Sequence, residues 1–289
     1  MIASRKERTK YKTMKKEKPE DIVLRYSKRG MTVLREAMQN DYCLESAQEI
    51  LSWKKGTVFL TTGFYVAGFA ETDGPAGTVM LAKALQVLGY RPVIVTDSYC
   101  KDFFEPEEIE VLYLELCADE TDCRRLLERY RPVGLISVER CGKNTQNDYA
   151  NMRGVSIAAH TAPADLLFEL ASGTIPTIGI GDGGNEIGMG NAADLIAEKL
   201  SLVPCKVCVD KLVIATVSNW GAYAVIAYLK QLTGAGVFPS FSQIYDYIDK
   251  TVRLGSVDGV LKEHAISVDG FGMDVEKEIV EALAAAIRP

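Results

Sequence analysis

A glycine-rich segment in the second half of the chain carries two carboxylates. It reads GIGDGGNEIGMGN (179–191), with six glycines around Asp182 and Glu186. Glycines let a backbone approach a ligand closely, and carboxylates bind cations, either a divalent metal or an ammonium group. The segment also contains GxGxxG, the fingerprint of dinucleotide sites. Because the two acids place negative charge where a pyrophosphate would bind, we expect no nucleotide there.

Three carboxylates are candidate ligands for a divalent metal: Asp73, Asp182 and Glu186. Asp73 lies in the turn TDGP, ahead of a predicted helix. Mg²⁺ and Mn²⁺ prefer oxygen ligands, and one or two carboxylates with waters and substrate oxygens are sufficient. Asp258 and Asp269, each in a VDG turn, are weaker candidates, since a plain turn explains them equally well.

Arginines and amides supply candidate substrate-binding groups. The segment ERCGKNTQNDYANMRG (139–154) contains Arg140 and Arg153. A guanidinium binds a carboxylate bidentately, so either arginine could anchor an acidic substrate or pair with a nearby acid as part of the framework. Asn219 follows another apolar run and either caps a helix or lines the same pocket.

The elements that must position these residues alternate between strands and helices. From residue 58 onward, short apolar runs such as RPVIVTD and VGLISVER alternate with amphipathic segments, and residues 19–52 have helical periodicity. This pattern predicts an α/β fold: a mainly parallel, Rossmann-like sheet with helices on both faces and extra helices at the N-terminus. Each unusual segment follows a predicted strand, at 61–77, 139–154, 180–191 and 218–223. Because the carboxyl ends of parallel strands share one edge, these segments are expected to form one pocket.

Charge and composition exclude several classes of protein. Residues 1–18 hold eight basic and two acidic residues, which predicts a solvated, poorly ordered tail ahead of a single α/β catalytic domain at 19–289. The remainder holds 25 basic and 37 acidic residues, so no nucleic acid is expected as a partner. The uncharged run 212–229 has polar residues at its centre, so we expect a strand and a helix rather than a membrane span.

Seven cysteines without framework spacing are typical of a reduced, cytoplasmic protein. The oligomeric state stays open, with a homo-oligomer among the options.

Taken together, the motifs resemble those of the D-glutamate cyclase family. The resemblance rests on TGF (62–64), ETDGPAG (71–77), ER (139–140) with YANMRG (149–154), GIGDGGNEIGMGN, SNWGAY (218–223) and the paired VDG turns. It covers roughly residues 20–289 and matches the carboxyl-terminal catalytic domain of the longer mitochondrial members, in the manner of a stand-alone microbial form. One departure follows NMRG, where an aspartate is expected and this chain has Val155, Ser156 and Ile157.

The resemblance implies a lyase that dehydrates D-glutamate to 5-oxo-D-proline, so the expected partner is a small acidic amino acid. Such a reaction needs a neutral amine, an activated carboxylate and a folded substrate. We expect Mn²⁺ or Mg²⁺ on the three candidate ligands, Glu139 as general base, and Arg140 or Arg153 as the carboxylate clamp. The expected catalytic residues are Glu139, Asp182 and Glu186, and the expected substrate-binding residues are Gly63, Arg140, Asn151, Arg153, Gly183, Gly184, Asn185 and Asn219.

Two other functions are compatible with the same residues. A binding module would hold a metabolite or nucleotide in this pocket without turnover. A hydrolase or lyase acting on a related small acid would use the same acidic loop. Tight binding of an unconverted ligand would separate the first alternative from an enzyme.

Overall fold

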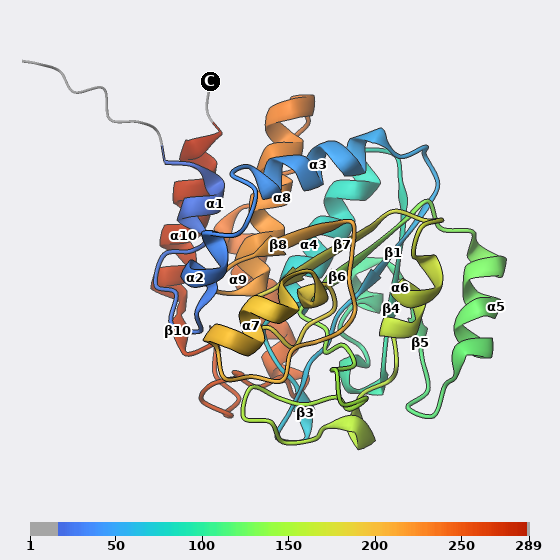
Figure 1. Ribbon diagram of the computed structural model, residues 1–289. Coiled ribbons are helices and arrows are strands. Elements are labelled where there is room, and N and C mark those ends of the chain that lie inside the picture. The colour runs from blue at the N-terminus through green and yellow to red at the C-terminus, as the bar shows by residue number, and fades with distance from the viewer. Residues whose placement is uncertain (1–16, 288–289) are drawn as a thin grey trace, which may run out of the picture.

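The centre of the molecule is a six-stranded parallel sheet with the order β5-β4-β1-β6-β7-β8 (Figure 1). The structure, a computed structural model, describes residues 17–287, so the basic tail expected at 1–18 lies outside the described residues except for its last two positions. The strands are β1 (Thr57–Thr61), β4 (Arg91–Thr96), β5 (Glu110–Tyr113), β6 (Gly134–Val138), β7 (Thr177–Gly181) and β8 (Lys211–Ile214).

The strand order identifies where a ligand pocket can form. The chain runs outward from β1 through β4 to β5, returns to the other side of β1 at β6, and continues through β7 to β8. All neighbouring strands pair in parallel. This is the doubly wound, Rossmann-like order, in which ligands bind beyond the carboxyl ends of the strands at the switch point. Here the switch point lies between β1 and β6, and the predicted α/β fold is confirmed.

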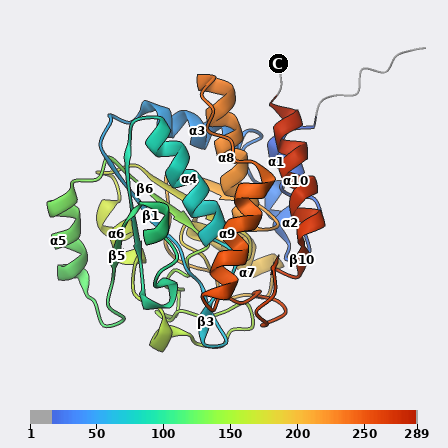
Figure 2. The ribbon, with the colours of Figure 1, turned by 180° about the vertical axis from the view of Figure 1, so that it is seen from behind.

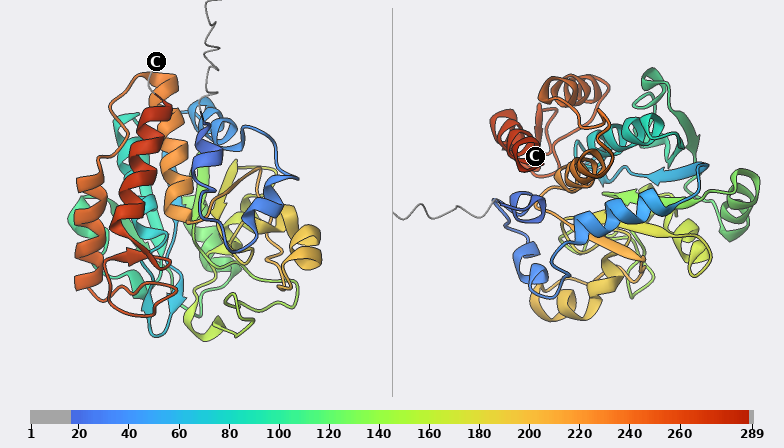
Figure 3. Two further views of the ribbon diagram at one scale, coloured as in Figure 1. Left: turned by 90° about the vertical axis from the view of Figure 1, so that its left-hand side faces the viewer. Right: turned by 90° about the horizontal axis from the view of Figure 1, so that it is seen from above.

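Two layers of helices cover the sheet. One face carries α4 (Pro75–Val87), α8 (Ser218–Thr233), α9 (Phe241–Arg253) and α10 (Met273–Ala286) (Figures 1 and 2). The other carries α5 (Glu120–Tyr130), α6 (Asp165–Ala171) and α7 (Ala193–Lys199), and Figure 3 shows the sheet between the two layers. Every residue of β1, β6 and β7 is buried, as expected for strands covered on both faces.

The N-terminal region is helical but interrupted. It forms α1 (Pro19–Ile22), α2 (Met31–Arg35) and α3 (Tyr42–Ser52), where the periodicity of residues 19–52 predicted helix throughout. Gly30 precedes α2 with a φ of 86°, a left-handed conformation that glycine adopts without strain. The turn that this break creates carries Arg29 to the carboxyl edge of the sheet.

Short elements complete the carboxyl edge. Two antiparallel pairs are β2 (Tyr65–Val66) with β3 (Phe69–Ala70) and β9 (Ser267–Val268) with β10 (Phe271–Gly272). The 3₁₀ turns are η1 (Ser98–Cys100), η2 (Glu105–Glu107), η3 (Ala158–His160) and η4 (Met189–Ala192). Within residues 17–287, the helices are too short or too polar to cross a membrane.

Candidate functional site

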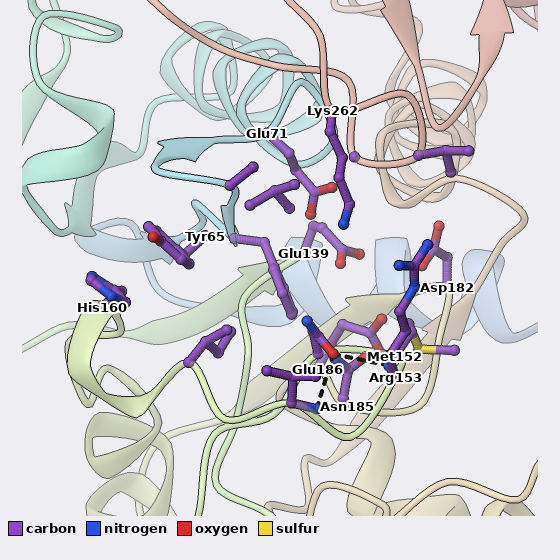
Figure 4. Close-up of a pocket in the computed structure, with 18 of the residues that line it drawn as sticks. Tyr65, Glu71, Glu139, Met152, Arg153, His160, Asp182, Asn185, Glu186 and Lys262 are labelled. Atoms are coloured by element: carbon purple, nitrogen blue, oxygen red, sulfur yellow. Dashed lines mark hydrogen bonds between the residues drawn. The ribbon is translucent and has the colours of Figure 1, made fainter.

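A pocket of about 490 Å³ opens beyond the carboxyl ends of β1, β6 and β7. Its walls come from segments far apart in the sequence: 64–67 after β1, 151–157 after β6, 182–186 after β7, and 259–262 near the C-terminus. Figure 4 shows Glu139 near its middle. Four strand-end segments were expected to form this pocket. Three of them line it at the switch point, whereas no residue of the fourth, 218–223 after β8, is part of the lining.

Three buried carboxylates form the chemical centre of this region. One oxygen from each of Asp73, Glu139 and Asp182 lies within 4.8 Å of the others, and all three residues are buried. This set differs from the predicted one, because Glu139 takes the place of Glu186. Three hard oxygen donors at this spacing suit a divalent cation.

Glu186 is held by the loop that contains it. Its two carboxylate oxygens accept hydrogen bonds from the backbone amides of Gly183 (2.8 Å) and Gly184 (2.7 Å). A Cβ on Gly183 would lie 2.8 Å from the same carboxylate, and Gly184 has a φ of 114°. The glycines therefore let the backbone of the loop bind the carboxylate of Glu186. Glu186 is not part of the cluster formed by Asp73, Glu139 and Asp182.

Glu139 follows β6 in a strained conformation. Its φ of 47° lies in the left-handed region, which a residue with a Cβ seldom adopts. Its Oε2 accepts a hydrogen bond of 2.5 Å from the Ser218 hydroxyl at the start of α8. Burial raises the pKa of Glu139 well above its usual range, and the negative charges of Asp182 and Glu186 raise it further. The carboxyl group therefore has an increased affinity for a proton.

Asp73 is fixed from two directions. Its Oδ1 accepts from the amides of Gly74 and Asn219, and its Oδ2 accepts from the amide of Ser218, each at 2.8 Å. Burial raises the pKa of Asp73 above its usual range, while these backbone bonds oppose the change. The next residue in its own turn and the first turn of α8 therefore hold this carboxylate, which does not line the pocket.

Arg29 reaches the cluster from the N-terminal region, and no motif in the sequence indicated it. Its Nη1 donates to both oxygens of Asp182 at 2.8 Å, and its Nη2 donates to Asp269 at 2.7 Å. Asp269, a weaker metal candidate from the VDG turns, is thus bound by an arginine. Because residues 1–18 already hold eight basic residues, Arg29 did not stand out in the sequence.

Arg140 belongs to the framework, which corrects the prediction that it clamps the substrate. Its side chain is fully buried and forms an ion pair of 2.6 Å with Asp97. It also donates to the backbone carbonyls of Gly63 (2.6 Å) and Ala162 (2.7 Å). Gly63 therefore contributes its carbonyl to Arg140, and neither residue lines the pocket.

Asn219 caps a helix, one of the two roles expected for it. Its Oδ1 accepts from the amides of Gly74 (3.0 Å) and Gly77 (2.6 Å) at the start of α4. Its Nδ2 donates to the carbonyl of Thr72 at 3.1 Å. The side chain thus satisfies the first turn of α4 from another helix, and it supports the cluster without facing the pocket.

The predicted substrate-binding residues that do line the pocket are Asn151, Arg153 and Asn185. The Asn151 Oδ1 accepts from the amide of Arg153, which fixes the loop. Asn185 donates to the carbonyl of Ala150, and within residues 17–287 its buried Oδ1 has no hydrogen-bond partner. This oxygen is available to accept a hydrogen bond from a ligand.

The segment where the family resemblance predicts an aspartate also lines the pocket. Val155, Ser156 and Ile157 all contribute to the wall. The hydroxyl of Ser156 donates to Asp148 at 2.7 Å, so an acid from an earlier position in the chain lies beside it.

The site combines a doubly wound α/β sheet with a carboxylate cluster at its switch point. The chain belongs to the family described as D-glutamate cyclase-like, C-terminal, whose model matches residues 20–284. Mitochondrial D-glutamate cyclase from Homo sapiens is 28% identical over 263 residues, covering 76% of this chain and 42% of the human protein. The chain thus spans less than half the length of that relative.

A solved structure, that of the TT0495 protein from Thermus thermophilus, aligns with 82% of this chain and 91% of its own. The sequence identity is 14% and the TM-score is 0.29, which is too low to support a further argument.

Proposed function

We propose that the chain is a D-glutamate cyclase, a carbon–oxygen lyase that closes D-glutamate to 5-oxo-D-proline and releases water. The observation that carries the proposal is the cluster of Asp73, Glu139 and Asp182, with carboxylate oxygens within 4.8 Å of one another beside the pocket. Membership of the family supports the choice of reaction. A site so rich in carboxylates favours a ligand that brings positive charge, and the ammonium group of an amino acid does so.

The cluster fits a divalent ion, Mn²⁺ or Mg²⁺. One or two carboxylates with waters and substrate oxygens are sufficient for these ions, so Asp73 and Asp182 would hold the ion. When bound, the ion would supply positive charge that polarises a carboxyl oxygen. Its charge would also offset the mutual repulsion of the buried acids, which raises the pKa of Asp73 and Glu139.

Glu139 then serves as the general base. It lines the pocket, whereas Asp73 does not, so it is the member of the cluster that a substrate ammonium reaches. Its raised pKa brings its proton affinity closer to that of an amine, which favours proton transfer. Removing that proton leaves the neutral amine that cyclisation requires.

Arg153 and Lys262 would bind the substrate carboxylates. Both line the pocket, and within the described residues neither takes part in an ion pair. Lys262 points into the pocket near Glu71 and Glu139 (Figure 4). Holding the ends of D-glutamate brings its nitrogen against the side-chain carbon, a proximity effect that can contribute roughly 7 kcal/mol or more.

Proton NMR of D-glutamate incubated with the purified protein tests this proposal, with Mn²⁺, with Mg²⁺ and with a chelator. We expect signals of 5-oxo-D-proline that cease to grow when the metal is removed. The Asp182→Asn variant should lose both metal binding and turnover while it stays folded. Normal turnover in that variant would remove Asp182 from the mechanism. Tight binding of D-glutamate without conversion would favour a binding module instead.

A further inference from the structure

The pocket has two ends of different chemistry. Asp182 and Glu186 lie toward one side, Tyr65 and His160 lie together at the other, and Glu139 lies between them (Figure 4). The proposed cyclisation uses the acidic side and the middle. The aromatic side has no part in it, although it forms a continuous wall of the same cavity.

This aromatic wall is rigidly built. The rings of Tyr65 and His160 stack with centroids 4.2 Å apart and planes 9° apart. The hydroxyl of Tyr99 lies 2.6 Å from Nδ1 of His160, and its ring meets Tyr65 edge-on at 4.9 Å. Tyr65 also packs against a small hydrophobic cluster that includes Phe64 and Ile157, which line the same pocket. Stacked rings held by such contacts form a surface suited to an apolar or aromatic ligand group.

The cavity is larger than D-glutamate requires. At the volume of about 30 Å³ that one water molecule occupies in the liquid, the ten non-hydrogen atoms of D-glutamate would take up about 300 Å³. A cavity of about 490 Å³ leaves more than a third of its space beyond that molecule. The spare space and the aromatic wall are parts of one cavity.

We propose that the site also cyclises γ-amides of D-glutamate, with the amine portion of the substrate against Tyr65 and His160. The inference rests on the proposed function, because it uses the same pocket and the same ring closure. The α-nitrogen attacks the side-chain amide carbon, a new C–N bond forms, and the bond to the departing nitrogen breaks. The ammonium loses two protons as its nitrogen becomes the lactam N–H. Glu139 takes the first and passes it to the departing nitrogen, and the second goes to the same nitrogen. The products are 5-oxo-D-proline and the amine in its protonated form, with no water or redox partner consumed.

The charge of the site favours an amide over the free acid. A γ-carboxylate brings a further negative charge next to Glu71, Glu139 and Asp182, all of which are buried. An amide carbonyl is neutral, so an attacking amine meets no negative charge. The departing amine becomes a cation, which the surrounding carboxylates stabilise.

The test compares D-glutamate, D-glutamine and the γ-benzylamide of D-glutamate with the full chain and Mn²⁺. NMR follows 5-oxo-D-proline, and chromatography follows benzylamine. We expect kcat/KM for the benzylamide to exceed that for D-glutamine by tenfold or more, since its ring fills the aromatic side. Conversion of D-glutamate without release of benzylamine would overturn the inference and leave the proposed function standing. Conversion of both amides without conversion of D-glutamate would overturn the proposed function and leave the inference standing. If no compound is converted, the inference and the proposed function are both overturned.

Variants locate the amine portion of the substrate. Tyr65→Ala should lower the ratio of kcat/KM for the benzylamide to that for D-glutamine by about tenfold, whereas Tyr65→Phe, which keeps the ring, should preserve it. Tyr245→Ala is a matched control, because Tyr245 is exposed on α9 and lies outside the pocket. Turnover of D-glutamine in each variant reports that it is folded. An unchanged ratio in Tyr65→Ala would overturn the assignment of this wall.

Discussion

Arg29 donates to both carboxylate oxygens of Asp182, although the two residues lie 153 positions apart in the chain. The second terminal nitrogen of the same guanidinium binds Asp269. One side chain thereby joins the N-terminal region, the glycine-rich loop and the last VDG turn. It also occupies the oxygens of an acid that we expect to bind a metal, so the arginine and the ion compete for Asp182.

Replacing Arg29 by glutamine should strengthen metal binding. The change removes a positive charge beside the cluster and frees both oxygens of Asp182, so we expect the affinity for Mn²⁺ to rise on the order of tenfold. Isothermal titration calorimetry measures it. Arg25→Gln is the control from the same region, because Arg25 pairs with Glu17 and Glu278 at the surface. Unchanged or weaker binding in Arg29→Gln would show that the arginine does not compete with the ion.

Glu139→Gln should separate proton transfer from metal binding. Glutamine keeps an acceptor for the Ser218 hydroxyl but cannot take a proton, so we expect kcat to fall by roughly 10²–10⁴. The affinity for Mn²⁺ should change by less than about threefold, since one or two carboxylates suffice for the ion. Steady-state kinetics and calorimetry on one preparation provide both values. Glu115→Gln, at an exposed position, should alter neither value. A parallel loss of binding and turnover would instead make Glu139 a metal ligand.

Much of the fold followed from local patterns. Apolar runs such as TVFLT and TIGIG predicted strands, and the alternation with helices predicted a parallel sheet. A parallel sheet brings its strand ends to one edge, so the positions of Asp73, Glu139 and Asp182 near one another were also predictable.

The partners of the side chains were less predictable, because they depend on tertiary contacts. Arg140 and Arg153 lie in one polar segment, yet one pairs with Asp97 in the interior and the other lines the pocket. Glu139 lies in the carboxylate cluster where Glu186 was expected, since Glu186 is bound by the amides of its own loop. The contact between Arg29 and Asp182 depends on a break in an apparently continuous helical pattern. No local signal distinguishes these outcomes.

The amide of Asn219 should stabilise the fold rather than the chemistry. Asn219→Ala leaves the amide of Gly77 and the carbonyl of Thr72 without a partner in the interior, and the amide of Gly74 keeps only its bond to Asp73. We expect the free energy of unfolding to fall by about 3 kcal/mol, because buried groups that lose their partners are costly. Urea denaturation measures the change. Gln231→Ala, at an exposed position of the same helix, should change it by less than about 0.5 kcal/mol. A similar small change in Asn219→Ala would show that water replaces the lost bonds.

Glu276 should make the stability of the protein depend on pH. Its Oε2 accepts a hydrogen bond from the indole of Trp220, and its Oε1 has no partner within residues 17–287. Burial raises the pKa of this carboxyl to about 7 from an ordinary value of 4.5. The folded state therefore binds the proton more tightly than the unfolded state. Its contribution to stability is complete below pH 4.5 and is lost as pH rises to about 7, a change of about 3 kcal/mol.

Glu276→Gln isolates this contribution from those of the other buried acids. Glutamine resembles the protonated carboxyl, so at pH 4.5 the variant and the parent should differ little in the free energy of unfolding. Because the parent must ionise a buried group as pH rises, the variant should become more stable than the parent by about 3 kcal/mol at pH 8. Urea denaturation at pH 4.5, 6 and 8 measures the difference. Glu281→Gln lies on the same helix and is exposed, so its difference from the parent should be small at every pH. A constant difference for Glu276→Gln across this range would mean that Glu276 stays ionised in the folded protein.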